Sequence, residues 1–400
     1  MIPFNTDDSL TAEILGRDRS LFADAVEANA GALAAAIEGR RILVAGASGS
    51  IGGAFVQQLV RYRPAALHLV DISENSLVEL VRELRSSETV LPGDFETFSI
   101  DYGSAEFARM CAAHGPHDMF LNFAAMKHVR SERNVFSLLR MIETNVLALQ
   151  RYLRSEAAQR LATVFSVSTD KVVRPANLMG ATKNLMEKCL FSFSGAAKAT
   201  SSRFANVAFS DGSLLYGFGM RLTKRQPLAL PKGIRRYFIS HEEAGQLCLL
   251  AACAGADREV FFPRMDAAHD AKDFIEIADL YLAHHGLAAL PCASEEEAKA
   301  RIGETTDAWP CFYSETDTTG EKPLEEFFRV TDTPDYARHA NIGVVTEADP
   351  EAGVMDRFTA DIEAFRAGGG WSKEAVVDII RRAVPELDHN ELNRSLDSKM

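Results

Sequence analysis

The sequence lacks the features that mark membrane, secreted and nucleic-acid-binding proteins. Its longest apolar runs, such as Leu247 to Ala256, are well below the roughly 20 residues that a membrane-spanning helix needs. Its amino end, MIPFNTDDSL, has neither the basic start nor the apolar core of a secretory signal. The formal net charge of −13 repels nucleic acid and anionic membranes. We therefore expect a cytoplasmic protein with no nucleic-acid or membrane partner.

Cysteine is sparse as well. The six cysteines are scattered and form no C-x-x-C pair, so the sequence predicts reduced thiols rather than disulfides or a zinc site. His114 and His117 are separated by Gly-Pro, which prevents a helix from directing both rings at one ion. We expect no metal site.

The sequence does contain an alternation of short apolar runs and helical patterns. Helical segments are predicted from Ile51 to Tyr62, through Leu77, Leu80, Val81 and Leu84, and from Phe136 to Leu153. Buried strands are predicted at 41–46, 67–71, 119–125 and 162–169. Strands that alternate with helices form a parallel sheet covered on both faces. We therefore predict an α/β fold, a Rossmann-type doubly wound parallel sheet.

Four regions are expected along the chain. A helix from about Leu10 to Glu38 leads into the main domain, and Gly39 is a plausible stop. Near the other end, three glycines at 368–370 break the chain and Ser372 is placed to cap a new helix. The predicted regions are a helical leader (1–39), a Rossmann-type domain (40–210), a smaller region (211–320) and a largely helical extension (321–400).

The loop GASGSIG follows the first predicted strand and opens a helix. Glycines at this spacing permit a tight turn and let backbone N–H groups approach a pyrophosphate. Asp71 ends the next strand, where an acid binds the ribose hydroxyls of a dinucleotide. No cation follows it until Arg82, so NAD is favoured over NADP. The predicted cofactor-binding residues of the loop are Gly46, Ser48, Gly49, Ser50, Ile51 and Gly52.

Asp101 follows a further apolar segment, FSI. It could bind the adenine amino group, and an ordinary turn aspartate accounts for it equally well. Both interpretations remain open from the sequence.

With these residues assembled, the chain resembles the extended short-chain dehydrogenase/reductases, specifically the polysaccharide-biosynthesis branch typified by UDP-N-acetylglucosamine 4,6-dehydratases. The matching motifs are GASGSIG, NFAAMKHVRSERN, ETNV, VSTDKVVRPANLMGATK, RFANVAFSDGS and RRYFIS. The resemblance implies a soluble homo-oligomer that binds NAD and a UDP-sugar. One residue departs from the short-chain dehydrogenase pattern Y-x-x-x-K: Met179 stands where a tyrosine would precede Lys183, a variant found within this branch.

The resemblance also implies roles for individual residues. Lys183 orients the cofactor beside its nicotinamide ribose, with Ala124 also near the cofactor. The C4 hydroxyl proton passes to a water or directly to the Thr169/Asp170 pair, and Lys171 is the base that removes the sugar C5 proton. Asp170, once protonated, assists departure of the C6 hydroxyl. With Met179 lining the pocket, the cycle oxidises C4, eliminates the C6 hydroxyl and returns the hydride to C6, giving a 4-keto-6-deoxy sugar nucleotide.

The resemblance makes residues 40–210 the NAD-binding domain and residues 211–320 the sugar-nucleotide-binding region. For the substrate it implies contacts from Asn206 and Arg236 to the diphosphate, with Lys127 and Ser213 lining the same pocket. A solvated surface charge accounts for Lys127 nearly as well. Arginine suits phosphate because its planar fork donates two parallel hydrogen bonds. Asp211 stands where relatives commonly have another residue, which weakens the inferred base and sugar preference.

Two other functions fit parts of the same pattern. A sugar-nucleotide epimerase would use the same fold and hydride step, whereas Asp170 and Lys171 favour elimination. Alternatively, the chain binds a dinucleotide without catalysing a reaction, and Met179 then marks the loss of the tyrosine that would transfer a proton.

Overall fold

The computed structural model describes residues 8–193, 197–314 and 324–389. Its centre is an eight-stranded sheet in the order β14-β10-β6-β5-β4-β1-β2-β3. Neighbouring strands run parallel except for β14, which pairs antiparallel with β10. The α/β prediction is thus confirmed. The strands are β1 (Arg41–Ala45), β2 (Ala66–Asp71), β3 (Asp94–Ser99), β4 (Met119–Asn122), β5 (Thr163–Val167), β6 (Lys198–Ser202), β10 (Glu259–Pro263) and β14 (Ile342–Thr346).

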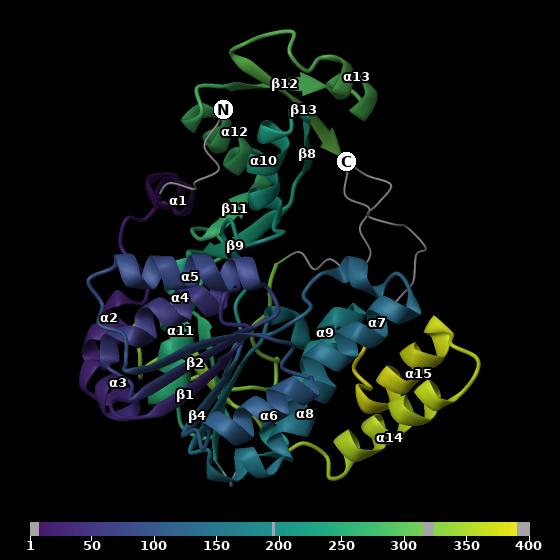
Figure 1. Ribbon diagram of the computed structural model, residues 1–400. Coiled ribbons are helices and arrows are strands. Elements are labelled where there is room, and N and C mark those ends of the chain that lie inside the picture. The colour runs from purple at the N-terminus through teal and green to yellow at the C-terminus, as the bar shows by residue number, and fades with distance from the viewer. Residues whose placement is uncertain (1–7, 194–196, 315–323, 390–400) are drawn as a thin grey trace.

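Helices cover both faces of this sheet (Figure 1), because its central strands are apolar on both sides. One face packs against α4 (Ser50–Leu59), α5 (Glu74–Ser86) and α11 (His241–Ala254). The other face packs against α6 (Ala105–His114), α7 (Val135–Ile142), α8 (Ala148–Leu153) and α9 (Leu178–Ser192). A π-helical turn, η3 (Glu143–Leu147), joins α7 to α8.

The leader is not the single helix that its sequence predicts. It forms α1 (Asp8–Leu15), α2 (Ala23–Ala28) and α3 (Ala30–Ile37). Gly16 ends α1 with a left-handed φ of 72°, and the Arg17 side chain after it pairs with Glu243 at 2.7 Å. Helix α1 packs in the core of the smaller lobe, whereas α3 packs under the main sheet.

The smaller lobe stands above the central sheet in Figure 1. Its sheet has the order β12-β13-β8, from β8 (Leu228–Pro231), β12 (Ala288–Cys292) and β13 (Ala308–Ser314). Helices α10 (Leu214–Thr223), α12 (Phe274–His284) and α13 (Glu295–Ala300) accompany it. A second small sheet, β11-β9-β7, contains β7 (Asn206–Val207), β9 (Arg235–Ile239) and β11 (Ala271–Asp273).

The carboxyl-terminal part is built into the main core. Helices α14 (Val354–Ala367) and α15 (Lys373–Ala383) pack beside α9 and α7 (Figure 1). Ser372 caps α15, as its sequence predicts, by accepting a hydrogen bond from the Ala375 amide. Strand β14 was not expected in this region, and it completes one edge of the main sheet.

A buried ion network ties this part to the sheet. Arg203, which is fully buried, donates to Glu187 Oε1 at 2.9 Å and to Glu347 Oε1 at 2.6 Å. Glu187 lies on α9 and Glu347 follows β14. Because buried charges are tolerated only when paired, the network requires the three segments to be assembled together.

The described residues include neither a membrane-spanning helix nor a metal-ligand cluster. In residues 8–193, 197–314 and 324–389, no helix has the length and apolarity to cross a membrane. The same residues hold no group of three or more metal-ligating side chains.

Candidate functional site

The site predicted from the sequence lies at the carboxyl ends of the parallel strands of the main sheet. Strands β1, β2, β4 and β5 run parallel, so their carboxyl ends meet there. Ligands of open α/β sheets bind in the crevice outside this edge. The glycine loop, Asp71 and the 169–171 triplet all follow these strand ends.

The glycine loop has room for backbone only. Gly46 has a left-handed φ of 71°, and a Cβ there would lie 2.4 Å from the Ala124 amide nitrogen. A Cβ on Gly52 would lie 2.1 Å from the Gly46 carbonyl oxygen. These approaches keep the turn tight and bring the start of α4 against β1, with Gly49 as its N-cap.

Two features of this loop fit a dinucleotide. Asp71 Oδ2 accepts a hydrogen bond from the Ser48 amide at 3.0 Å, so the acid stands beside the loop. The Ser48 hydroxyl is buried, and it has no hydrogen-bond partner among the residues that the structure describes. A buried hydroxyl without a partner costs free energy, and a bound phosphate oxygen would satisfy it. The residues present therefore fit the predicted cofactor.

Asp101 is engaged as a turn residue. Its carboxylate accepts the Gly103 amide at 2.8 Å and pairs with Arg140 at 2.6 Å. Burial raises the pKa of Asp101, but the Gly103 amide hydrogen bond and the Arg140 pair together outweigh it, so the pKa is lowered. These contacts are those of the ordinary turn aspartate, while a role toward adenine stays a prediction.

Lys183 projects from α9 toward the end of β5. Its Nζ donates to the Val167 carbonyl oxygen at 2.6 Å, and its side chain is buried. Burial lowers the Lys183 pKa to about 8. Met179, one turn earlier, is also buried, and its backbone amide donates to Glu132 Oε1 at 2.8 Å. The thioether thus lies inside the protein, beside the lysine.

The 169–171 triplet forms one connected cluster in the short helix η5 (Asp170–Val172) and the residue before it. Asp170 is buried, and its Oδ1 accepts from Thr169 Oγ1 at 2.8 Å and from Lys171 Nζ at 3.1 Å. Lys171 is more open, with 38% of its side chain exposed. The Thr169 hydroxyl and the Lys171 amine therefore both donate to one carboxylate oxygen of Asp170 at the opening of the site.

The two residues expected to bind diphosphate, Asn206 and Arg236, converge on a carboxylate of the chain itself. Asn206 Nδ2 donates to Glu325 Oε1 at 2.8 Å, and Arg236 Nε lies 3.6 Å from the same oxygen. Glu325 belongs to the carboxyl-terminal part, which the sequence motifs do not reach.

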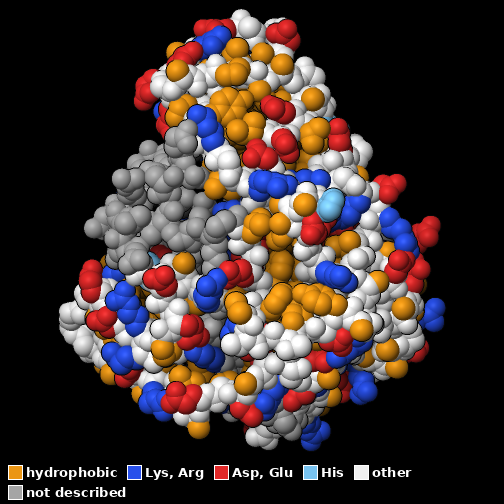
Figure 2. Space-filling view, turned by 180° about the vertical axis from the view of Figure 1, so that it is seen from behind, with side chains coloured by type: hydrophobic (Ala, Val, Ile, Leu, Met, Phe, Trp, Pro, Cys, Tyr) orange, Lys and Arg blue, Asp and Glu red, His pale blue; other side chains and the backbone are white. Residues whose placement is uncertain are grey.

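Lys127 and Ser213 approach the site from two loops. Lys127 follows β4, and desolvation lowers its pKa against the opposing charge of Asp211. Ser213 caps α10 by accepting from the Tyr216 amide at 3.2 Å. The Asp211 amide donates to Ser50 Oγ at 2.9 Å, so the glycine loop contacts the segment that leads into the smaller lobe. In Figure 2, Lys and Arg side chains gather where the two lobes meet.

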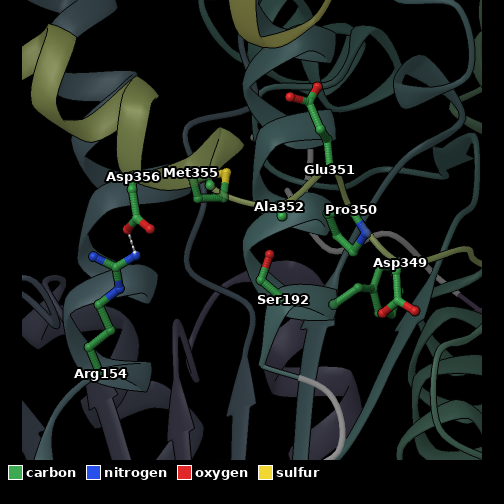
Figure 3. A pocket seen from close by; sticks show the side chains of 10 residues that line it. Arg154, Ser192, Asp349, Pro350, Glu351, Ala352, Met355 and Asp356 are labelled. Carbon is green, nitrogen blue, oxygen red and sulfur yellow. Dashed lines mark hydrogen bonds and ion pairs between the residues drawn. The ribbon is translucent and has the colours of Figure 1, made fainter.

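A separate hollow of about 340 Å³ lies away from these residues (Figure 3). Arg154 and Ser192, at the ends of α8 and α9, line it together with residues 349–353 and the Arg154–Asp356 ion pair. Those helix ends lead into the starts of β5 and β6. The hollow therefore lies beside the amino ends of these strands, whereas the predicted site lies at their carboxyl ends.

Sequence reasoning missed three residues of the site. Asn145, in the π-helical turn, bonds both the amide and the carbonyl of Met126 and the Thr182 hydroxyl at 2.8 to 3.1 Å. It holds the loop after β4 against α9, and the motif ETNV was its signal. Glu132 lies within the motif that contains Lys127, but nothing local showed that it meets Met179. Glu325 had no sequence signal.

Comparison with known proteins places these motifs. The sequence pattern of a family described as polysaccharide biosynthesis protein matches residues 42–303. The chain is 33% identical over 245 residues to a protein of Methanocaldococcus jannaschii named an uncharacterized membrane protein, covering 60% of this chain and 70% of that protein. It is 28% identical over 254 residues to the capsular polysaccharide biosynthesis protein CapD of Staphylococcus aureus (62% and 41%). It is 29% identical over 163 residues to the UDP-glucose 4-epimerase of Rickettsia rickettsii (39% and 47%). The last two matches span less than half of each relative.

Solved structures share the fold at low identity. Pen from Bacillus thuringiensis superposes with a TM-score of 0.61 at 18% identity, covering 78% of this chain and 87% of that one. An epimerase from Methanothermobacter thermautotrophicus gives 0.55 at 15% identity (74% and 86%). The enzyme WbmH of Bordetella bronchiseptica, solved in complex with NAD⁺, gives 0.51 at 13% identity (72% and 89%).

Proposed function

Because the chain belongs to the polysaccharide biosynthesis protein family, we propose that it is an NAD-dependent sugar-nucleotide 4,6-dehydratase. Its proposed substrate is a UDP-N-acetylhexosamine, UDP-N-acetylglucosamine foremost, and its product is a 4-keto-6-deoxy sugar nucleotide for glycan synthesis. The observation that carries the proposal is the contact of Lys171 and Thr169 with one oxygen of the buried Asp170. An enzyme that only oxidises and re-reduces C4 needs a group for the C4 hydroxyl proton but no base for C5, so Lys171 would have no proton to remove.

The chain's residues would hold the cofactor as follows. The backbone of residues 46–52 and the Ser48 hydroxyl would take the pyrophosphate, and Asp71 the adenosine ribose. Lys183 would lie at the nicotinamide ribose, where its positive charge favours hydride acceptance. NAD, when bound, supplies a hydride acceptor that returns the same hydride before product leaves.

The proton steps fall to the triplet. Thr169 and Asp170 accept the C4 hydroxyl proton as the ketone forms, and the ketone acidifies the neighbouring C5–H. Lys171 then removes the C5 proton, and Asp170 gives a proton to the departing C6 hydroxyl, which leaves as water. After the hydride has returned to C6, Lys171 gives its proton back to C5. The 3.1 Å contact between Lys171 Nζ and Asp170 Oδ1 keeps the base and the acid side by side for these steps.

An epimerase is the second candidate, favoured by the match to UDP-glucose 4-epimerase. That reaction returns the hydride to C4 from the other face and eliminates nothing. The Asp170–Lys171 pair would then have no proton at C5 or C6 to move, which is why we place it second.

One incubation separates these functions. The purified protein is mixed with UDP-N-acetylglucosamine and NAD⁺, and the products are analysed by mass spectrometry. We expect loss of one water from the sugar nucleotide. An isomer of unchanged mass would establish the epimerase. If UDP-N-acetylglucosamine is unaltered, and UDP-glucose tested in the same way is unaltered too, dinucleotide binding without catalysis is the remaining function.

A further inference from the structure

The Glu325 carboxylate occupies a cluster of N–H donors at the join of the two lobes. Its Oε1 accepts from Asn206 Nδ2 at 2.8 Å and faces Arg236 Nε at 3.6 Å, and its Oε2 accepts from the Tyr237 amide at 3.3 Å. Its side chain is 3% exposed, and that of Arg236 is 12% exposed. The donors come from β7 and β9, which pair in parallel. This is the arrangement of an anion-binding site, filled by a residue of the same chain.

The fold holds Glu325 there by its neighbours. Phe327, two residues later, stacks on Tyr237 and on Phe262, with ring centroids 6.1 and 6.0 Å apart. The Phe327 carbonyl oxygen accepts from Arg203 Nη1 at 3.1 Å. The backbone beside Glu325 is therefore anchored, while the carboxylate is joined to it by the rotatable bonds of one side chain.

Asn206 and Arg236 are the residues that the resemblance to sugar-nucleotide dehydratases assigns to the substrate diphosphate. A diphosphate oxygen and the Glu325 carboxylate would need the same donors, and two anions on one set of donors repel each other. We propose that Glu325 is an internal substitute for the substrate phosphate: it fills the diphosphate site of the free protein and must turn away when a nucleoside diphosphate binds. This inference rests on the proposed function, because it concerns the same site.

The surroundings of Glu325 make it a replaceable occupant. Burial and the nearby Asp170 charge raise the Glu325 pKa, against the opposing effects of the backbone amides and Arg236. A diphosphate carries more charge and more acceptor oxygens than one carboxylate, so it gains more from Arg236. Turning Glu325 out would also remove a negative charge from the neighbourhood of Asp170.

The test is the affinity for UDP, measured by calorimetry on the full chain. Glu325→Gln removes the charge and keeps the size, and Glu325→Ala removes the competitor altogether. We expect Glu325→Gln to bind UDP about tenfold more tightly than the parent, the scale of one charge-assisted hydrogen bond, and Glu325→Ala at least as tightly as Glu325→Gln. Glu326→Gln, a change at the adjacent residue that pairs with Arg174, should leave the Kd unchanged.

A double-variant cycle shows whether the gain passes through the shared donors. Arg236→Ala should weaken UDP binding, and adding Glu325→Gln to it should recover much less than the tenfold gain seen in the parent. Circular dichroism and the melting temperature establish that each variant is folded. If Glu325→Gln does not fold, the UDP affinity of Glu325→Ala decides the test.

The outcomes that overturn the inference are distinct from failure of the proposed function. Unchanged or weaker UDP binding in folded Glu325→Gln and Glu325→Ala, with dehydratase product still formed by the parent, overturns the inference alone. Weaker binding of UDP-N-acetylglucosamine with UDP unaffected would make Glu325 a sugar ligand instead. If neither the parent nor any variant binds UDP, the UDP-sugar assignment falls and the inference with it.

Discussion

The side chain of Met179 is buried one helical turn before Lys183 and carries no group that can transfer a proton. Its backbone amide, rather than its thioether, makes the contact with Glu132. Met179→Leu, a swap of similar volume, should therefore cost less than about 1.5 kcal/mol of stability and retain most activity. Rates of product formation and thermal melts of the two proteins check this.

Lys171 is expected to behave in the opposite way. Lys171→Ala should lower product formation by about 10²- to 10⁴-fold, the usual contribution of a general base. Because C4 oxidation precedes its step, the variant should still develop NADH absorbance on adding substrate, without exchange of solvent deuterium into C5. Deuterium exchange at the parental rate would place the C5 base elsewhere.

Lys183 links the site to pH. Its pKa is lowered from 10.5 to about 8 by burial, so the folded apoprotein binds fewer protons than the unfolded chain between these values. The destabilisation is complete below pH 8 and is relieved as pH rises toward 10.5. Relative to Lys183→Met, the parent should gain on the order of 3 kcal/mol across that window. Urea unfolding of both apoproteins at pH 7 and pH 10 measures the difference, and equal changes in the two would contradict it.

At the scale of single residues, the sequence located the side chains whose positions depend only on neighbouring residues in the chain. Gly46, Asp71 and Lys183 follow strand ends or stand at a fixed helical spacing, so position along the chain was enough. Glu325 was out of reach because it meets Asn206 and Arg236 only after two distant segments fold against each other. The Ser48 hydroxyl was predicted as part of the loop, but its lack of a partner among the described residues appears only in three dimensions.

Among the elements, β6, α9 and the segment after β14 depend on one guanidinium. Arg203→Met would leave Glu187 and Glu347 buried with less compensating charge, although Arg329 also contacts Glu347 at 2.8 Å. We expect a loss of about 3 to 5 kcal/mol in the free energy of unfolding. Arg382→Met, which breaks an exposed pair with Asp361, should cost at most about 1 kcal/mol. Denaturant titrations compare the two, and similar losses would refute the structural role of the network.

The elements themselves were predictable where the pattern was periodic and the neighbours were close. Strands β1, β2, β4 and β5 and helices α4, α5, α7 and α8 follow from apolar runs that alternate with helical spacing, whereas β3 and α6 were not predicted. The single leader helix was wrong because apolar spacing does not register the left-handed turn at Gly16. Strand β14 was missed because its partner β10 lies far back in the chain and pairs with it antiparallel, outside the alternation of strands and helices.

For the whole molecule, the carboxyl-terminal helices contribute to the principal core. Val354, Phe358, Ile362, Val376 and Ile380 are buried in the same cluster as residues of α7 and α9. Deleting residues 348–400 would expose that apolar face, and we expect an insoluble product or one that no longer melts cooperatively. Expression trials and calorimetry test this. A soluble, cooperatively melting shortened chain would show that the helices are an independent appendage.

The pairing of β14 with β10 also has a consequence for folding during synthesis, because the two strands are far apart in the sequence. The ribosome makes β10 well before β14, and at typical elongation rates the interval is roughly 4 to 17 s. During that time the apolar edge strand Val260 to Phe262 has no partner on one side, and unpaired apolar edges invite pairing between chains. A nascent chain of this protein is therefore a natural client for chaperones that bind extended apolar segments, and co-expression of such chaperones should raise the yield of soluble protein.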